Sequence, residues 1–114
     1  MQSNFSVEVH DGERAVLIGV SGELDLASSP ELERELERGA TSDAELLIID
    51  LRKLEFMDST GLSVLVRAHQ KVTQGGKRFA VVKGPQQVQR LLSLTGVAEK
   101  LTVVDSPEEL LAGS

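Results

Sequence analysis

The sequence contains no cysteine, tryptophan or tyrosine, and its aromatic share of 3% consists of phenylalanine alone. The absence of cysteine excludes disulfides, thiol nucleophiles and thiolate metal ligands. Apolar residues still make up 40% of the 114 residues, so the core must be built from aliphatic side chains. No apolar run approaches the ~18 residues of a membrane-spanning helix, and no basic segment followed by an apolar one opens the chain. We therefore expect one cytoplasmic domain over residues 1–114, with its core at about 5–111.

The net charge of −6 disfavours two classes of partner. An acidic surface repels both nucleic acid and anionic lipid, so neither is expected to bind. The two histidines, His10 and His69, have no acidic or histidine neighbour at the spacing of metal ligands. We predict no metal site and no cofactor.

Strand and helix patterns alternate along the chain. Period-two alternation or short apolar runs predict strands over residues 5–9, 14–20, 46–51, 78–83 and 101–104. Helical spacing and capping residues predict helices from Ser28 or Ser29 to Gly39, over 59–73, from Pro85 to about Gly96, and after Ser106-Pro107. The resulting order, ββαβαβαβα, predicts an α/β fold: a mixed, mostly parallel sheet with right-handed crossovers, packed with short helices.

The run from Phe56 to Leu62 stands where a predicted strand ends and a helix begins. Asp58 is a good helix N-cap, because its carboxylate can accept the free N–H groups of the next turn. Ser59 then occupies the first helical position with its hydroxyl pointing outward. A hydroxyl there, beside one carboxylate and near the flexible Gly61, favours covalent modification over core packing.

Three segments together resemble the STAS domain family, specifically the bacterial anti-sigma factor antagonists. The first is Gly22-Glu23-Leu24-Asp25. The second is Leu47-Ile48-Ile49-Asp50-Leu51, followed after six residues by Asp58-Ser59-Thr60-Gly61-Leu62. The third is Gln87-Val88-Gln89-Arg90-Leu91-Leu92, leading to Thr95-Gly96-Val97. The resemblance covers about residues 7–111, and its specificity lies in the order and spacing of the segments.

The resemblance implies a function. Such proteins bind an anti-sigma factor and thereby release a sigma factor for transcription. The anti-sigma factor is often a serine kinase that phosphorylates the residue after the Asp, here Ser59, and a PP2C-type phosphatase usually reverses the modification. The resemblance further implies partner contacts by the loop and helix-start residues Glu23, Asp25, Asp58, Ser59, Thr60, Gly61 and Leu62.

Other functions have less support in the sequence. Catalysis is not expected, because the chain has neither Gly-x-Ser-x-Gly nor a Walker-type phosphate loop, and His69 lies about 15 Å along the helix from Ser59. A nucleotide-binding module and a scaffold that is never phosphorylated remain alternatives within the family, whereas a regulatory tail of a transporter is disfavoured because no membrane part is expected. Thr60 is expected to cap the helix locally. Asp50 is expected at the end of its strand or bonded to a backbone group, without a chemical role.

Overall fold

The computed structural model describes residues 4–111. Its strands are β1 (Phe5–Asp11), β2 (Ala15–Leu24), β3 (Leu46–Met57), β4 (Arg78–Val82) and β5 (Thr102–Val104). Its helices are α1 (Ser29–Ala40), α2 (Ser59–Gln74), α3 (Gln86–Leu94), α4 (Val97–Lys100) and α5 (Glu108–Leu111).

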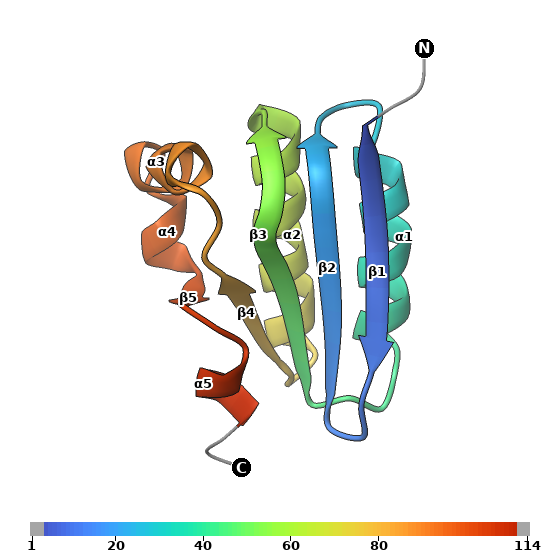
Figure 1. Ribbon diagram of the computed structural model, residues 1–114. Helices are drawn as coiled ribbons and strands as arrows, with labels where there is room; N and C mark the ends of the chain where they lie inside the picture. The colour runs from blue at the N-terminus through green and yellow to red at the C-terminus, as the bar shows by residue number, and fades with distance from the viewer. Residues whose placement is uncertain (1–3, 112–114) are drawn as a thin grey trace.

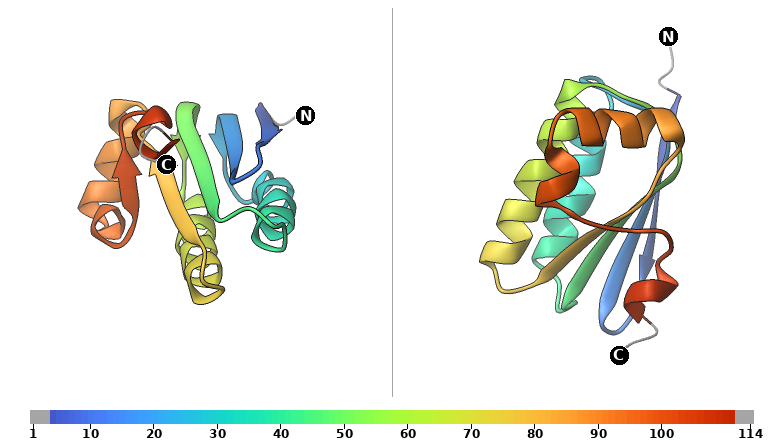
Figure 2. Two further views of the ribbon diagram at one scale, coloured as in Figure 1. Left: turned by 90° about the horizontal axis from the view of Figure 1, so that it is seen from below. Right: turned by 90° about the vertical axis from the view of Figure 1, so that its left-hand side faces the viewer.

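The five strands form one sheet in the order β1-β2-β3-β4-β5 (Figure 1). β1 runs antiparallel to β2, and every other neighbouring pair is parallel. α1 and α2 cover one face of this sheet, whereas the short α5 lies on the other (Figure 2). The predicted α/β class with a mixed, mostly parallel sheet is confirmed.

The main core lies between the sheet and the helices α1 and α2, and it is almost entirely aliphatic. A second, smaller cluster of Leu46, Ile48 and Val82 lies on the opposite face, where Leu110 of α5 packs against it. β3 contributes to both clusters, since Ile48 and Ile49 point to opposite faces and are both fully buried. This burial on two faces is what a short, continuous apolar run predicts.

The two central strands are longer than the sequence suggested. β3 has 12 residues instead of six, and β2 continues through the predicted loop to Leu24. The pairing of β2 with β3 shifts register twice, between Gly19 and Ser21 and between Gly22 and Glu23. Each extra residue restarts the alternation of side chains. Buried positions therefore fall at every third residue, at Leu51, Leu54 and Met57. This spacing differs from the period of two that is typical of a strand.

The helix ends also differ in part from the prediction. The α1 N-cap position, Ser28, makes no side-chain cap hydrogen bond to the helix, so the predicted serine cap is wrong. Gly39 does not end this helix but is buried inside it, where an added Cβ would lie 2.7 Å from Leu47 Cδ1. A four-residue helix, α4, follows α3 and was not predicted.

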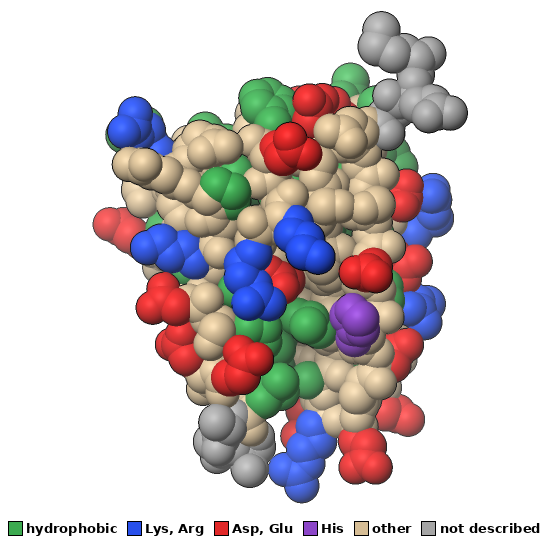
Figure 3. Space-filling view, viewed as in Figure 1, with side chains coloured by type: hydrophobic (Ala, Val, Ile, Leu, Met, Phe, Trp, Pro, Cys, Tyr) green, Lys and Arg blue, Asp and Glu red, His purple; other side chains and the backbone are tan. Residues whose placement is uncertain are grey.

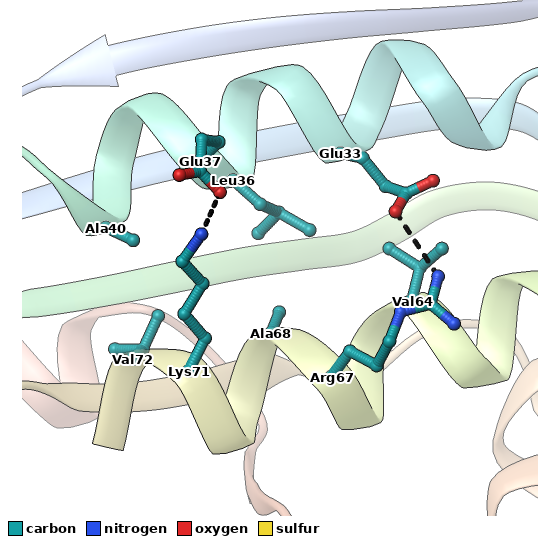
Figure 4. Close-up of a pocket in the computed structure, with 9 residues that line it drawn as sticks. All are labelled: Glu33, Leu36, Glu37, Ala40, Val64, Arg67, Ala68, Lys71 and Val72. Carbon is teal, nitrogen blue, oxygen red and sulfur yellow. Dashed lines mark hydrogen bonds and ion pairs between the residues drawn. The ribbon is translucent and has the colours of Figure 1, made fainter. Parts of the chain in front are cut away.

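α1 and α2 pack side by side above the sheet, with a hollow of about 230 Å³ between them (Figure 4). Small side chains such as Ala40 and Ala68 leave this space. Two ion pairs cross it: Glu33–Arg67, with Oε2 and Nη2 3.2 Å apart, and Glu37–Lys71. All four charged side chains are largely exposed, so these pairs contribute little to stability. Apolar contacts hold the two helices together.

None of the helices in the described part of the chain is long and apolar enough to span a bilayer.

Candidate functional site

The junction between β3 and α2 is organised by Asp58. Its backbone is extended, and its Oδ1 accepts hydrogen bonds from the N–H groups of Thr60 (2.9 Å) and Gly61 (3.1 Å). Its carbonyl oxygen accepts a third bond from the N–H of Leu62 at 3.2 Å. The predicted N-cap is confirmed: the side chain of Asp58 satisfies two of the donors that a helix start leaves unpaired, and its carbonyl accepts the first intrahelical bond.

The turn after β2 lies against this junction. The N–H of Asp58 donates to the carbonyl of Leu24 at 3.2 Å. Gly61 permits the approach, because a Cβ there would lie 2.7 Å from Met57 Cγ and 2.9 Å from Leu24 Cγ. Its φ is not positive. Gly61 is therefore required for close packing and not, as the sequence suggested, for backbone flexibility.

Ser59 is exposed at the first position of α2. Within residues 4–111 its hydroxyl has no hydrogen-bond partner, whereas its carbonyl accepts a bond from the Ser63 hydroxyl at 3.1 Å. Ser59 borders an open hollow of about 390 Å³ between α2 and α4, which Val66 and Val97 also line. The predicted outward direction of Ser59 is confirmed.

Asp25 and Ser28 form a reciprocal pair ahead of α1. Asp25 Oδ1 accepts from the N–H of Ser28 at 3.0 Å, and Ser28 Oγ accepts from the N–H of Asp25 at 2.9 Å. These two bonds close the turn ahead of α1, whose N-cap position is Ser28. Ser28 Oγ also donates to the carbonyl of Glu23 at 2.8 Å. The half-buried Asp25 is therefore engaged within the turn, and only Glu23 leaves its carboxylate exposed.

The residues expected to contact a partner thus lie at two adjacent places, the end of β2 with the turn after it and the β3–α2 junction, but their exposure differs. Leu62 is 7% exposed and belongs to the core. Thr60 is half-buried, and its N–H, not its hydroxyl, takes part in the cap. The exposed members are Glu23 and Ser59, with Asp58 half-buried between the two turns.

Two apolar residues beside these turns were missed. Leu26 is 74% exposed in the turn after β2, and Phe56 is 50% exposed near the end of β3, opposite Glu23. Leu26 has a visible sequence signal, because it lies outside the apolar spacing of the following helix. Phe56 has none, since its outward direction results from the register shifts in β3.

Asp50 lies in the middle of β3, not at its end, on the face opposite α1 and α2. Its carboxylate accepts a hydrogen bond from the backbone N–H of Arg52 at 3.0 Å, so the expected bond to a backbone group is confirmed. It also accepts from the Arg52 guanidinium at 2.8–3.1 Å. Burial raises the pKa of Asp50, but the hydrogen bonds and charge of Arg52 outweigh this and hold the pKa below its usual value. Charged side chains lie across the middle of this face, with hydrophobic ones in a hollow below them (Figure 3).

The two histidines lie far from Ser59 in the fold. His10 is exposed on the edge strand β1, and His69 packs edge-on against Phe79 with ring centroids 6.0 Å apart. Over residues 4–111, no group of three His, Asp or Glu side chains is arranged to hold a metal ion.

The cap makes a stability prediction. We expect Asp58→Ala to lower the free energy of unfolding by about 1 kcal/mol, because two N–H groups lose their acceptor. Asp58→Asn should cost only a few tenths, since its amide oxygen can still accept. Urea denaturation followed by circular dichroism measures both. An equal loss for Ala and Asn would contradict the capping role.

Comparison with known proteins agrees with this architecture. A family model described as "STAS domain" matches residues 4–110. The chain belongs to the STAS domain family. In this STAS domain, the cap at Asp58 and the exposed Ser59 lie well inside the matched region.

Curated relatives include an anti-sigma-B factor antagonist of Bacillus subtilis, 30% identical over 100 residues, which cover 88% of this chain and 91% of the relative. An anti-sigma F factor antagonist of Paenibacillus polymyxa is 27% identical over 104 residues, covering 90% and 89%. The crystal structure of an anti-sigma factor antagonist from Mycobacterium paratuberculosis superposes with a TM-score of 0.86 at 27% identity, covering 96% of this chain and 92% of that one.

Proposed function

We propose that this STAS domain is an anti-sigma factor antagonist. In its unmodified form it binds an anti-sigma factor and so releases a sigma factor for transcription. The names of its relatives support the type of partner. The surface that fits this role lies where β2 and β3 end, and it carries Glu23, Leu26, Phe56 and Ser59. A partner with serine kinase activity would be the enzyme that modifies the chain, and both would act in the bacterial cytoplasm.

The observation that carries the proposal is the exposure of Ser59. Its hydroxyl is free of intramolecular hydrogen bonds among the described residues, and it stands at a fixed helix start. A kinase can reach such an oxygen without unfolding any element. We propose Ser59 as the phosphorylation site, with a PP2C-type phosphatase as the reversing enzyme.

A phosphoryl group on Ser59 would find few partners within the chain. The N–H groups of Thr60 and Gly61 are already bonded to Asp58 Oδ1, so the first turn of α2 leaves only the N–H of Ser59 itself for an anion. The nearest cation on the same helix is Arg67, two turns away and paired with Glu33 at 3.2 Å. The added charge of roughly −1.5 to −2 would therefore project outward, toward the partner.

The size of the effect is sufficient for a switch. Moving a bound fraction from 99:1 to 1:99 takes about 5.5 kcal/mol. Two like charges about 4 Å apart repel by about 4 kcal/mol at an effective dielectric constant of 20, and a buried phosphate must also lose its hydration. One phosphoryl group can therefore separate the complex without altering the fold.

Phosphorylation by the cognate anti-sigma factor tests the proposed site. Incubation with ATP should place one phosphate on Ser59, which mass spectrometry of the digested protein locates. Ser59→Ala should remove it. Ser63→Ala is the matched control, because Ser63 is also exposed and lies one turn further along α2. Phosphate retained in Ser59→Ala would contradict the proposal by placing the modification at another residue. No phosphate on the unaltered chain would contradict it too, and would favour a scaffold that is never phosphorylated.

A further inference from the structure

A second hollow, of about 370 Å³, lies at the end of the sheet opposite Ser59. It is formed where α2 ends, where β4 begins and where α5 lies over the other face (Figure 1). Because β3 and β4 are parallel, β4 begins at the end of the sheet where β3 begins, and the β3–α2 junction lies at the other end. This hollow is therefore separate from the surface around Ser59 that is proposed to bind the anti-sigma factor.

The hollow exists because β5 covers β4 incompletely. β5 pairs only with Ala80–Val82, so Arg78 and Phe79 have no strand beside them on that edge. The resulting notch has an apolar floor, made by buried Leu46, Phe79 and Ala80 together with half-buried Leu110. Thr73 and Thr102 add hydroxyl groups at its sides.

The charged side chains that line the notch are all positive. Lys77 and Arg78 line it and no carboxylate does, although the chain as a whole carries −6. The Lys77 ammonium donates to the carbonyl of Ser42, which holds the ammonium in place and leaves further protons to donate. Arg78 is exposed, and its planar guanidinium can bind a carboxylate through two parallel hydrogen bonds.

His69 adds a polar group without a partner. Its ring lines the hollow, and its Nδ1 is the single buried side-chain nitrogen or oxygen of residues 4–111 that lacks a hydrogen bond. A buried polar atom left unpaired costs free energy. Because this atom is buried, a molecule in the notch would contact only the exposed part of the His69 ring.

We propose that this notch binds a small amphipathic anion, a carboxylate with a short alkyl chain. The head group would lie between Lys77 and Arg78, and the chain would lie on the floor of Leu46, Ala80 and Leu110. The volume of the notch is at the lower end of the range for ligand sites, which suits a ligand with a short alkyl chain. The inference does not depend on the role of Ser59.

Three probes with the same chain and different head groups test the proposal: octanoate, 1-octanol and octylammonium. Each is titrated into isotope-labelled protein below its micelle concentration, and amide shifts are followed by NMR. Octanoate should bind saturably, with shifts centred on Thr73, Arg78, Ala80 and Thr102. The alcohol should bind about tenfold more weakly, because it lacks the charge-assisted hydrogen bonds. Octylammonium should not bind there.

Charge variants distinguish recognition of the carboxylate from non-specific hydrophobic binding. Arg78→Gln and Lys77→Gln should each weaken octanoate binding about tenfold. Arg34→Gln, an exposed position on α1 that does not line the notch, removes the same charge and should leave binding unchanged. Equal affinity for octanoate and octylammonium, or shifts that remain in Arg78→Gln, would overturn the proposal, as would no binding of octanoate at all.

Discussion

Ser59→Asp should weaken binding to the anti-sigma factor by at least a hundredfold, whereas Ser59→Ala should bind as tightly as the unaltered protein. The aspartate places one negative charge where the phosphoryl group would stand, next to Asp58, whose Oδ1 already occupies the N–H groups of Thr60 and Gly61. One charge about 4 Å from a partner carboxylate is repelled by about 4 kcal/mol at an effective dielectric constant of 20, which exceeds the roughly 3 kcal/mol that a hundredfold loss requires. Isothermal titration calorimetry measures the affinities directly.

Two controls isolate the charge at this position. Ser59→Asn has nearly the same size as Ser59→Asp without the charge, and it should lose much less affinity. Ser93→Asp adds the same charge at an exposed position on α3 and should leave affinity unchanged. If Asn and Asp weakened binding equally, steric exclusion would replace electrostatic repulsion as the mechanism. Equal affinities for all variants would remove Ser59 from the interface.

Gly22→Ala should lower the free energy of unfolding by about 4 kcal/mol or prevent folding. Gly22 has φ of +86°, and a Cβ there would lie 1.7 Å from the carbonyl oxygen of Asn4 and 2.6 Å from its carbon. These are backbone atoms of the neighbouring strand segment, and the N–H of Glu23 donates to the same oxygen at 2.7 Å. The collision can be relieved only by separating β1 from β2.

Gly76→Ala is the matched control for Gly22→Ala. Gly76 has a nearly identical φ of +83°, but a Cβ there would meet nothing within 4 Å. Its substitution should cost only the strain of a left-handed backbone, about 1–2 kcal/mol. Urea denaturation of both variants gives the comparison. Equal losses would show that backbone strain alone, and not the contact with Asn4, makes glycine necessary at position 22.

The parts of the fold that could be predicted are those where local patterns match the final environment. Alternation in β1, the nearly all-apolar run at Leu46–Leu51 and the cap at Asp58 each reflect one local interaction. The second half of β3 could not be predicted, because its buried residues recur every third position. That spacing depends on bulges against β2, which are a property of the pair and not of either segment alone.

The candidate site shows the same division. Asp58 and Ser59 were found because a cap and the residue after it are fixed by neighbours in sequence. The exposure of Phe56, the burial of Leu62 and the packing role of Gly61 depend on where Leu24 and Met57 lie in space. Asp25 was placed in the correct turn, but its hydrogen bonds with Ser28 were not predicted, since serine is a common N-cap and was expected to cap the helix itself.

The most direct test of the mechanism compares backbone amide NMR spectra of the protein with and without phosphate on Ser59. We predict shifts confined to residues 57–63 and the adjacent turn at 23–28, together with loss of binding to the anti-sigma factor. Shifts spread across the five-stranded sheet would mean that phosphorylation acts by altering the fold, and would contradict the account of a charge placed at an unchanged surface.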